Sequence, residues 1–519
     1  MKHLSGNVSL DCGTIKDVSS CSFSYENDDI LVRLLGYMTS DGSDIVKTYN
    51  LYGPDLTKYI SGVYLLLIYD KNRKVLYVFH SWTTSPHNLY YTINNNRFYY
   101  STSLKKLFCL SRISRKFETF KLNDFLTNGY IVGKYTLVKN VFKLESFKYL
   151  RVEKALIQQK ESKYSFRNTD LESAKIQWDE VLNNAVLRSI ISDNEINMSI
   201  SAGYDSNYIM YIANKESNAH INAFSVGGNV GKNEIPLVEK NVRSYNNVSL
   251  FTTYTDSKTL SNLPDIVWRL EGATYECGIF LQYELARLLH ECNKTSIICG
   301  EGADQVMNVW CFDEHRTKPS GKNNLYKVSD YPYLFISNLV LKKSGILANS
   351  FGIETRYPYL DNEFISIAKE LVSLNGIDKS FHISRCKSTL PSDVVENIAK
   401  IGGSTDCQSL FQSEIEKEKF ISRIKRSEFY KIHHCLLREC SDRSKYSSRK
   451  YSIRYFIEIA SSLFNKKQNC KRLQLRNEIA LREYIGYAYL IIFQKLLLSG
   501  DYDELFEQDG IDINIIDIL

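Results

Sequence analysis

Short apolar runs separated by polar turns dominate the amino-terminal third of the chain. Val63–Tyr69 and Val75–Phe79 are rich in branched and aromatic side chains, and the polar stretch Asp70–Arg73 joins them. Phe98–Ser101 is a further run of this kind. Such runs, bounded by turn residues, predict strands joined as antiparallel hairpins. We therefore expect stacked antiparallel sheets over residues 1–155.

From Leu171 onward the pattern changes, because stretches of helical period alternate with short apolar runs. The predicted helices are Ala174–Ser189, Asn207–Asn214 and Leu281–His290, and the predicted strands are the run that ends at Ile200, the run Ala219–Ser225 and the run that starts at Ser296. This alternation indicates a parallel sheet with crossover helices. Beyond residue 400 the sequence predicts mainly helices, the last of them Arg476–Leu498.

A chain of 519 residues is long enough for several domains. The polar segment Gln158–Asn168 is the predicted linker between them. We expect an α/β protein with a β-rich domain over residues 1–155, an α/β domain with a parallel sheet and a helical carboxyl-terminal part over residues 170–500, and an acidic tail over residues 501–519. The acidic residues of the tail are Asp501, Asp503, Glu504, Glu507, Asp509, Asp512 and Asp517.

Composition excludes several classes of protein. Apolar residues make up 44% of the chain and charged residues 24%, which is typical of soluble globular proteins. The longest apolar run, Ile485–Leu498, contains Gln494 and Lys495 and is shorter than the roughly 20 residues of a membrane span. The first residues lack the apolar stretch of a secretory signal. Twelve scattered cysteines favour reduced thiols, so we expect a cytoplasmic protein.

The net charge of +6 is unevenly distributed. From Arg423 to Arg482 the chain has sixteen Lys or Arg against five Asp or Glu. Such a segment could hold nucleic acid, an acidic carrier or a peptide. The alternative is a set of solvated helix faces that the acidic tail partly neutralises, and we favour it because no aromatic-basic recognition motif accompanies the charge. No specific nucleic-acid partner is expected.

Two short loops carry small residues and one carboxylate each. Ser201–Ser206 and Gly300–Gln305 both follow strand-like runs and both precede a stretch that can be helical. In a parallel sheet they would meet at the carboxyl ends of neighbouring strands. Their backbone N–H groups could then contact phosphate oxygens while the carboxylates held magnesium. Each loop alone could be an ordinary turn. Two of them predict a nucleotide site.

The second half of the chain resembles the synthetase domain of the asparagine synthetase family. The matching segments, in order, are Ile200–Asn207 at the pyrophosphate loop, Ala223–Gly227 at the adenine-side strand, Cys299–Asp304 at the second acidic loop, Gly352–Asp361 at the motif Gly-x-Glu-x-Arg-x-Pro-Phe-Leu-Asp, and Leu390-Pro391 followed by Lys400. The first half resembles the glutaminase-type domain of the same family over Gly62–Asp70, Asn88–Tyr91, Tyr100–Leu107 and Thr136–Leu150.

The resemblance implies an Ntn-hydrolase-like β-sandwich followed by an α/β ATP-pyrophosphatase domain. It implies a ligase that uses ATP and Mg²⁺, adenylates a carboxylate, forms AMP and pyrophosphate, and makes an amide with an amine or ammonia. The substrates would be a small-molecule or peptide carboxylate and its amine partner. A homodimer is left open.

The resemblance also assigns roles to single residues. Asp205 and Asp304 would hold magnesium; Ser201, Gly203, Asp205, Ser206, Val226 and Gly300 would bind ATP; Lys400, Glu301 and Glu354 would be catalytic. Lys400 would stabilise the developing oxyanion, and the two glutamates would orient or deprotonate the amine. Each has a structural alternative. Asp205 could cap the helix that follows, Glu354 could simply pair with Arg356, and Lys400 could be a solvated lysine.

Hydrolysis of glutamine in this family needs a cysteine directly after the initiator methionine. This chain has Lys2 there, and its first cysteine is Cys12. We therefore expect a domain that keeps its fold without hydrolysis, as in the relatives that make β-lactams and lasso peptides. The minority hypothesis is that removal of a leader exposes Cys12, because the dipeptide Cys12-Gly13 matches the start of active members.

Further departures bear on the substrate. Ala202, Asn207 and Gln305 replace a usual glycine, hydroxyl residue and acid, and the added Cβ of Ala202 could weaken ATP binding. Glu301 is the residue of the asparagine-forming branch, which favours a small amine. Two alternatives stay open: a lasso cyclase-like or other peptide-modifying enzyme of a biosynthetic cluster, and a catalytically decayed binding scaffold.

Two other motifs are set aside. Gly227–Asn233 resembles a P-loop, but its glycine spacing is one residue short and no Ser or Thr follows Lys232. His433, His434, Cys435 and Cys440 could bind zinc, but no second ligand pair stands at finger spacing, so we favour a structural use.

Overall fold

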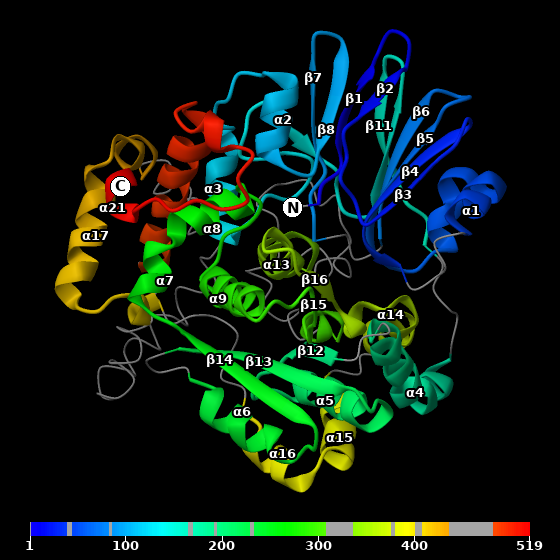
Figure 1. Cartoon of the computed structure of the whole chain (residues 1–519), viewed down its shortest axis with the longest axis vertical. Helices are drawn as coiled ribbons and strands as arrows, with labels where there is room; N and C mark the ends of the chain where they lie inside the picture. The colour runs from blue at the N-terminus through cyan, green and yellow to red at the C-terminus, as the bar shows by residue number, and fades with distance from the viewer. Residues whose placement is uncertain are drawn as a thin grey trace, which may run out of the picture.

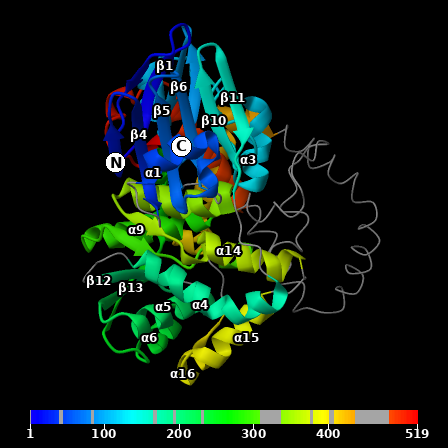
Figure 2. The same ribbon diagram turned by 90° about the vertical axis from the view of Figure 1, so that its right-hand side faces the viewer.

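The structure is a computed structural model, and it describes residues 2–38, 44–81, 86–164, 170–190, 195–228, 233–307, 336–374, 379–399, 407–434 and 481–519. Antiparallel sheets of the amino-terminal part lie above an α/β part with a separate sheet (Figures 1 and 2). Among the described residues, no helix is long and apolar enough to cross a membrane.

The amino-terminal part is a sandwich of two antiparallel sheets, with strand orders β2-β1-β8-β7-β9 and β11-β10-β6-β5-β4-β3. The strands are β1 Ser5–Ser9, β2 Ile15–Asp17, β3 Phe23–Glu26, β4 Ile30–Met38, β5 Gly62–Asp70, β6 Val75–His80, β7 Tyr90–Asn94, β8 Arg97–Ser101, β9 Phe142–Lys143, β10 Lys148–Glu153 and β11 Leu156–Glu161; the helices are α1 Asp44–Tyr52, α2 Leu104–Ser111 and α3 Leu122–Asn128. The predicted strands and stacked sheets are confirmed.

Strand β5 shows why the sandwich forms. Its side chains alternate between two cores, as the two-residue period of a strand requires. Leu65 and Leu67 join the core between the two sheets. Leu66 and Ile68 join a second core on the opposite face, where they meet α1. The strand is therefore apolar at almost every position, which made its run easy to recognise in the sequence.

The predicted linker Gln158–Asn168 is wrong at its start. Residues up to Glu161 belong to β11, which pairs with β10 along its whole length. β11 is the last strand of its sheet, and its side chains stay exposed or half-buried. An edge strand of this kind needs no apolar face, so its polar composition resembled that of a linker.

The carboxyl-terminal part has a five-stranded parallel sheet in the order β14-β13-β12-β15-β16. Its strands are β12 Glu195–Ser199, β13 His220–Gly228, β14 Val248–Thr255, β15 Ser296–Ile298 and β16 Glu354–Arg356. Helices α4 Leu171–Ser189, α5 Tyr204–Glu216, α6 Ile235–Val242 and α9 Gly278–Glu291 flank the sheet, with α9 on one face and α5 and α6 on the other (Figure 1). The predicted parallel sheet with crossover helices is confirmed.

The remaining elements are mostly helical, as predicted. They are α7 Ser257–Ser261, α8 Leu263–Leu270, α10 Ala303–Val306, α13 Leu347–Ser350, α14 Asn362–Ala368, α15 Ser380–Thr389, α16 Ser392–Asn397, α17 Glu414–Arg426, a helix over 481–493 that continues as a π-turn at Gln494–Leu498, and α21 Ile515–Ile518. Most of the basic segment Arg423–Arg482 lies outside the described residues.

The two parts share one hydrophobic core and several buried polar contacts. Helices α2 and α3 pack with α8 and the helix over 481–493 in a single apolar cluster. At the start of α2, the Ser103 hydroxyl donates to the buried Glu271 carboxylate at 2.7 Å. The Tyr357 N–H donates to the Tyr37 hydroxyl at 3.2 Å. The β-sandwich is therefore packed directly on the domain that carries the acidic loops.

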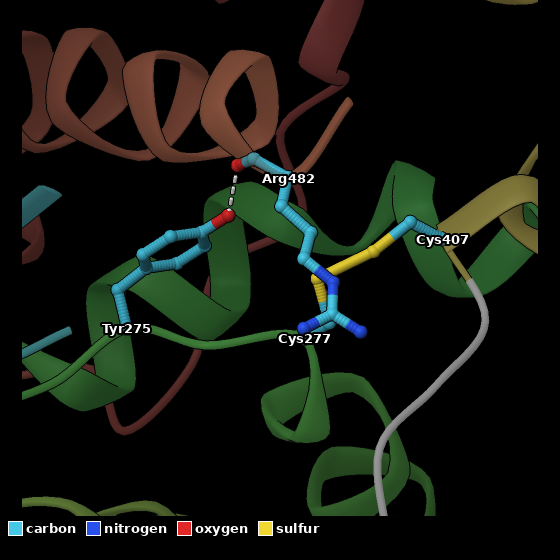
Figure 3. Close-up of a disulfide and its surroundings, with 4 residues drawn as sticks. All are labelled: Tyr275, Cys277, Cys407 and Arg482. Atoms are coloured by element: carbon cyan, nitrogen blue, oxygen red, sulfur yellow. Dashed lines mark hydrogen bonds between the residues drawn. A yellow bond between two sulfur atoms is a disulfide. The ribbon is translucent and has the colours of Figure 1, made fainter. Parts of the chain in front are cut away.

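A disulfide joins Cys277, at the start of α9, to Cys407 (Figure 3). The expectation that every cysteine is reduced is therefore wrong for this pair. The two residues are 130 positions apart, so no local spacing marks them as partners. The other described cysteines are free. Beside the bridge, the Tyr275 hydroxyl donates to the carbonyl of Arg482 (Figure 3).

Replacing the bridge should lower stability without touching the acidic loops. A cross-link that closes so long a loop restricts the unfolded chain, and loss of such a link costs about 2–4 kcal/mol. Cys277→Ser and Cys407→Ser should each lower the free energy of unfolding by that amount, measured by urea denaturation. Cys109→Ser, at an exposed free thiol, is the matched control. Equal stability of all three variants would show that the bridge does not form in solution.

Candidate active site

The two acidic loops meet at one edge of the parallel sheet. Ser201 to Gly203 follow β12, and Gly300 to Gly302 follow β15. β12 and β15 are direct neighbours, with Met198 opposite Ile298. A Cβ on Gly300 would lie 3.4 Å from the backbone nitrogen of Ser206, so the two loops lie next to each other. The two loops therefore lie side by side, as the sequence predicts.

Asp205 and Asp304 converge on one ammonium group. Asp205 lies in the first turn of α5, and Asp304 lies in the first turn of α10. The Nζ atom of Lys379 lies 2.5 Å from a carboxylate oxygen of each. Gly203 is the N-cap of α5, so Asp205 does not cap this helix, contrary to the structural alternative.

Lys379 is a site residue that sequence reasoning missed. It is the N-cap residue of α15, far from both loops in the chain. A single lysine before a helix carries no local signal for a role of this kind. Only the packing of α15 beside the loops brings its ammonium between the two carboxylates.

The charges of this cluster support one another. Burial opposes ionisation of Asp205, but Lys379 and then His382 outweigh it and lower the pKa of Asp205 to about 2. Burial also opposes the charge of Lys379, and Asp205 and Asp304 together raise the pKa of its ammonium above the ordinary value. The aspartate and the lysine are therefore both charged at neutral pH.

This donor set fits magnesium. Asp205 and Asp304 both pair with the ammonium of Lys379, so their carboxylates converge on one position. The Oδ1 atom of Asp205 is buried without a hydrogen-bond partner among the described residues. In the described part of the chain, no cluster of three or more His, Cys, Asp or Glu side chains could hold a metal. Magnesium in nucleotide enzymes usually takes only one or two carboxylates and completes its shell with phosphates and water. Two convergent carboxylates meet that requirement.

Hydroxyl and amide groups brace the loop that precedes α5. The Ser201 and Ser206 hydroxyls lie 3.0 Å apart, and Gly203 N–H donates to the Ser201 hydroxyl at 3.2 Å. The Asn207 amide donates to the carbonyls of Ser201 and Gly203, at 2.9 and 2.7 Å. Asn207, which replaces a usual hydroxyl residue, therefore ties the loop's carbonyls to the first turns of the helix.

Both backbone polar groups of Ala202 form hydrogen bonds within the protein. It is fully buried, and its N–H donates to the Glu234 carboxylate at 2.8 Å. Its carbonyl accepts from Ala399 N–H at 3.0 Å. Lys400 lies outside the described residues, so its catalytic role stays a prediction. The residue just before it, Ala399, is in contact with the loop that precedes Asp205.

Glu301 is held in place through one of its two carboxylate oxygens. Gln282, on α9, donates its side-chain amide to Oε1 at 3.0 Å. Oε2 is buried without a hydrogen-bond partner among the described residues. Burial raises the pKa of the adjacent Cys299 thiol, and Glu301 raises it further, so this thiol stays protonated. Gln282 was not predicted, because nothing in its local sequence distinguishes it from other helix residues.

Glu354 is not brought to the two loops. It lies opposite Ser296 at the amino end of β16, whereas the loops leave the carboxyl ends of β12 and β15. Its carboxylate pairs with the Arg356 guanidinium at 2.9 Å. This ion pair within one strand matches the structural alternative for Glu354, and its catalytic role stays a prediction. Val226 lies near the carboxyl end of β13, on the same edge as the loops.

Comparison with known proteins agrees with this arrangement. The model of the asparagine synthase family matches residues 177–329, and the model of the glutamine amidotransferase domain matches residues 36–165. The chain belongs to the asparagine synthetase family. The two family matches cover both the β-sandwich and the sheet that carries the acidic loops.

Relatives in this family are distant. A glutamine-hydrolysing asparagine synthetase 1 of Bacillus subtilis is 24% identical over 282 residues, which is 52% of this chain and 44% of the relative. Putative asparagine synthetases 2 and 1 of Methanocaldococcus jannaschii are 24% and 23% identical over 284 and 350 residues, which cover 52% and 64% of this chain and 54% and 60% of the relatives. The chain thus spans about half the length of the curated relatives it matches.

The geometry argues against Cys12 as an exposed amino-terminal nucleophile of this family member. Cys12 lies in the turn after β1, where hydrogen bonds to Ser9 and Thr14 lower the pKa of its thiol to about 7. Cleavage before Cys12 would remove β1, which pairs with β2 on one side and with β8 on the other. Processing there would take an interior strand out of the sandwich.

The remaining sequence motifs lie partly outside the described residues. Of the zinc candidates, His433 and His434 are described, and the Nδ1 atom of His434 lies 2.8 Å from the carbonyl of Tyr430. Cys435 and Cys440 lie outside the described residues, as do residues 229–232 of the P-loop-like segment.

Proposed function

We propose that this chain is an ATP-dependent ligase that adenylates a carboxylate and joins the acyl group to an amine, with release of AMP and pyrophosphate. The proposal rests on one observation. Asp205 and Asp304, which follow two loops at one edge of the sheet, both pair with the ammonium of Lys379. Carboxylates placed in this way beside small, hydroxyl-rich loops suit a magnesium-bound triphosphate.

In the first step a carboxylate oxygen of the substrate attacks the α-phosphorus of ATP, and the bond to the β-phosphate breaks with the electron pair leaving on pyrophosphate. Magnesium held by Asp205 and Asp304 would supply positive charge against the phosphate oxygens. With magnesium held by the two carboxylates, the Lys379 ammonium would be free to contact the pyrophosphate. The Ser201 and Ser206 hydroxyls can donate to the same oxygens.

In the second step an amine nitrogen attacks the acyl carbon, and AMP leaves with the electron pair of the broken bond. The Oε2 atom of Glu301, which has no hydrogen-bond partner among the described residues, would accept a proton or a hydrogen bond from the amine. Lys400 would stabilise the negative charge that develops on the acyl oxygen. A small amine or ammonia fits this proposal, because the asparagine-forming enzymes that this chain resembles also carry glutamate at the position of Glu301.

The direct test is ATP–pyrophosphate exchange across a panel of carboxylic acids. Exchange should appear only with the right acid, should require magnesium, and should be accompanied by AMP once an amine is added. ADP as product, or exchange that does not depend on any acid, would overturn the adenylating mechanism. The peptide-modifying and decayed-scaffold alternatives gain no specific support from the site, and the paired acidic loops oppose decay.

We also propose that the β-sandwich does not hydrolyse glutamine, because position 2 holds Lys2 and not a thiol. The purified chain should release no glutamate from glutamine, whereas ammonium or a free amine should support product formation. Glutamate release would be followed by an enzymatic assay, with Cys12→Ala as the companion variant. Glutaminase activity that disappeared in Cys12→Ala, together with a processed amino terminus in the mass spectrum, would restore the Cys12 hypothesis.

A further inference from the structure

Only one oxygen of the Asp205 carboxylate is satisfied by Lys379. Oδ2 accepts a hydrogen bond from the Lys379 ammonium, whereas Oδ1 is buried without a hydrogen-bond partner among the described residues. The side-chain donor that faces Oδ1 is the Nε2 atom of His382, 3.5 Å away. His382 lies on α15, one helical turn after Lys379, so both side chains project from the same face of the helix start toward Asp205.

The ring of His382 is fixed in position and in tautomer. The side chain is almost completely buried, and the rings of Tyr208 and Tyr359 contact it edge-on, with interplanar angles of 84° and 87°. The indole N–H of Trp178 points at Nδ1 from 3.4 Å. An indole nitrogen can only donate, so Nδ1 must present its lone pair and the imidazole proton lies on Nε2.

Of the three acceptors near that Nε2–H, two lead to Asp205, and the third is the weakly accepting sulfur of Cys386 at 3.4 Å. One is the direct approach to the Oδ1 atom of the carboxylate at 3.5 Å. The other is the Tyr359 hydroxyl at 3.2 Å, which in turn donates to the backbone carbonyl of Asp205 at 3.1 Å. Trp178, His382 and Tyr359 thus form a buried chain of donors and acceptors that ends at Asp205, the predicted metal ligand.

We propose that His382 is a positioning residue, which orients Asp205 for magnesium and pyrophosphate through an Nε2–H that Trp178 holds in one tautomer. The inference rests on the proposed function, because it needs Asp205 to hold the metal. A ligating carboxylate that can rotate binds metal poorly, and loss of an outer hydrogen-bond partner typically costs about 10- to 100-fold in metal affinity. Because the His382 side chain is almost completely buried, water cannot readily replace its donor.

Four variants separate orientation from packing. His382→Leu removes the donor and keeps much of the volume. His382→Gln keeps an N–H donor of similar reach. Trp178→Phe keeps the aromatic packing but removes the indole N–H, so that either tautomer becomes accessible. Cys386→Ala is the matched control, because its sulfur lies 3.4 Å from the same Nε2 atom of His382 but has no hydrogen bond to Asp205 among the described residues.

The measurement is the affinity of the full chain for magnesium pyrophosphate by titration calorimetry, beside the affinity for pyrophosphate in EDTA. His382→Leu should bind magnesium pyrophosphate about 10- to 100-fold more weakly and metal-free pyrophosphate as well as the unaltered chain. His382→Gln should recover most of the loss, Trp178→Phe should fall between them, and Cys386→Ala should lose thermal stability only. Near-equal affinities of the two His382 variants and the unaltered chain would overturn the inference.

Each outcome bears on a separate proposal. If the unaltered chain does not bind magnesium pyrophosphate, the proposed function fails, and the inference fails with it. If the unaltered chain binds and folded His382 variants bind equally well, only the inference fails. Should His382→Leu not fold, His382→Gln and Trp178→Phe still decide the case, because weaker metal-dependent binding in Trp178→Phe without loss of metal-free binding is expected only from a positioning role.

Discussion

Asp205→Asn and Asp304→Asn should each abolish acid-dependent ATP–pyrophosphate exchange and AMP formation. Both carboxylates lie 2.5 Å from the same ammonium, so both would hold the same magnesium when it is bound. Removal of either charge disables one unit, and the double variant should therefore be little worse than either single variant. The measurement is exchange at saturating ATP together with AMP release.

The control for this pair is Asp393→Asn, a substitution of an exposed aspartate in the first turn of α16. It should keep full activity. Mild acid cannot imitate the Asp205 substitution, because the Asp205 pKa of about 2 keeps this carboxylate ionised throughout the range in which enzymes are usually assayed. Full activity in either Asp205→Asn or Asp304→Asn, or purely additive losses, would contradict the shared site.

Lys400→Ala should lower turnover by roughly a hundred-fold or more, the usual scale for the loss of one preorganised electrostatic contact in the transition state. The affinity for ATP should change little, because Asp205, Asp304 and Lys379 remain. Lys400→Arg should recover only part of the rate, since a planar guanidinium does not reproduce a compact ammonium. Turnover and ATP affinity would be measured separately, by single-turnover kinetics and by calorimetry.

Lys379→Ala is the comparison for Lys400. Its ammonium already lies between the two carboxylates, so its loss should weaken binding of ATP and pyrophosphate more than it slows a bound substrate. Lys400→Ala should thus lower mainly turnover, whereas Lys379→Ala should lower mainly the affinity for ATP and pyrophosphate. A Lys400→Ala variant with weakened ATP binding and normal turnover at saturation would identify Lys400 as a nucleotide ligand instead.

Local pattern sufficed for the elements and for the two loops. The apolar run of β5 and the helix-strand alternation after Leu171 are properties of short windows, and both predicted the observed sheets. The same holds for Asp205 and Asp304. A parallel sheet brings the carboxyl ends of neighbouring strands together, so loops after β12 and β15 had to meet if the strands were neighbours.

The same local reasoning failed where an element's place in the sheet mattered. β11 is polar because it is an edge strand, which the composition of Leu156–Glu161 cannot reveal. For Glu354, whose catalytic role is a prediction from a family motif, the structure adds that it stands at the amino end of β16 and pairs with Arg356. A motif match locates a residue along the chain. The direction of the strand decides which edge of the sheet that residue reaches.

By itself, the sequence determined the fold class, the order of the two parts and the acidic loops at the sheet edge, because periodicity and loop composition are readable in short windows. Only the tertiary structure decided that Lys379 lies between Asp205 and Asp304, that the Nε2 atom of His382 faces the Asp205 carboxylate, and that Cys277 pairs with Cys407. These contacts join residues 75 to 174 positions apart in the first case and 130 in the last. Contacts at such separations depend on how helices pack against the sheet, and no local pattern of side chains encodes that packing.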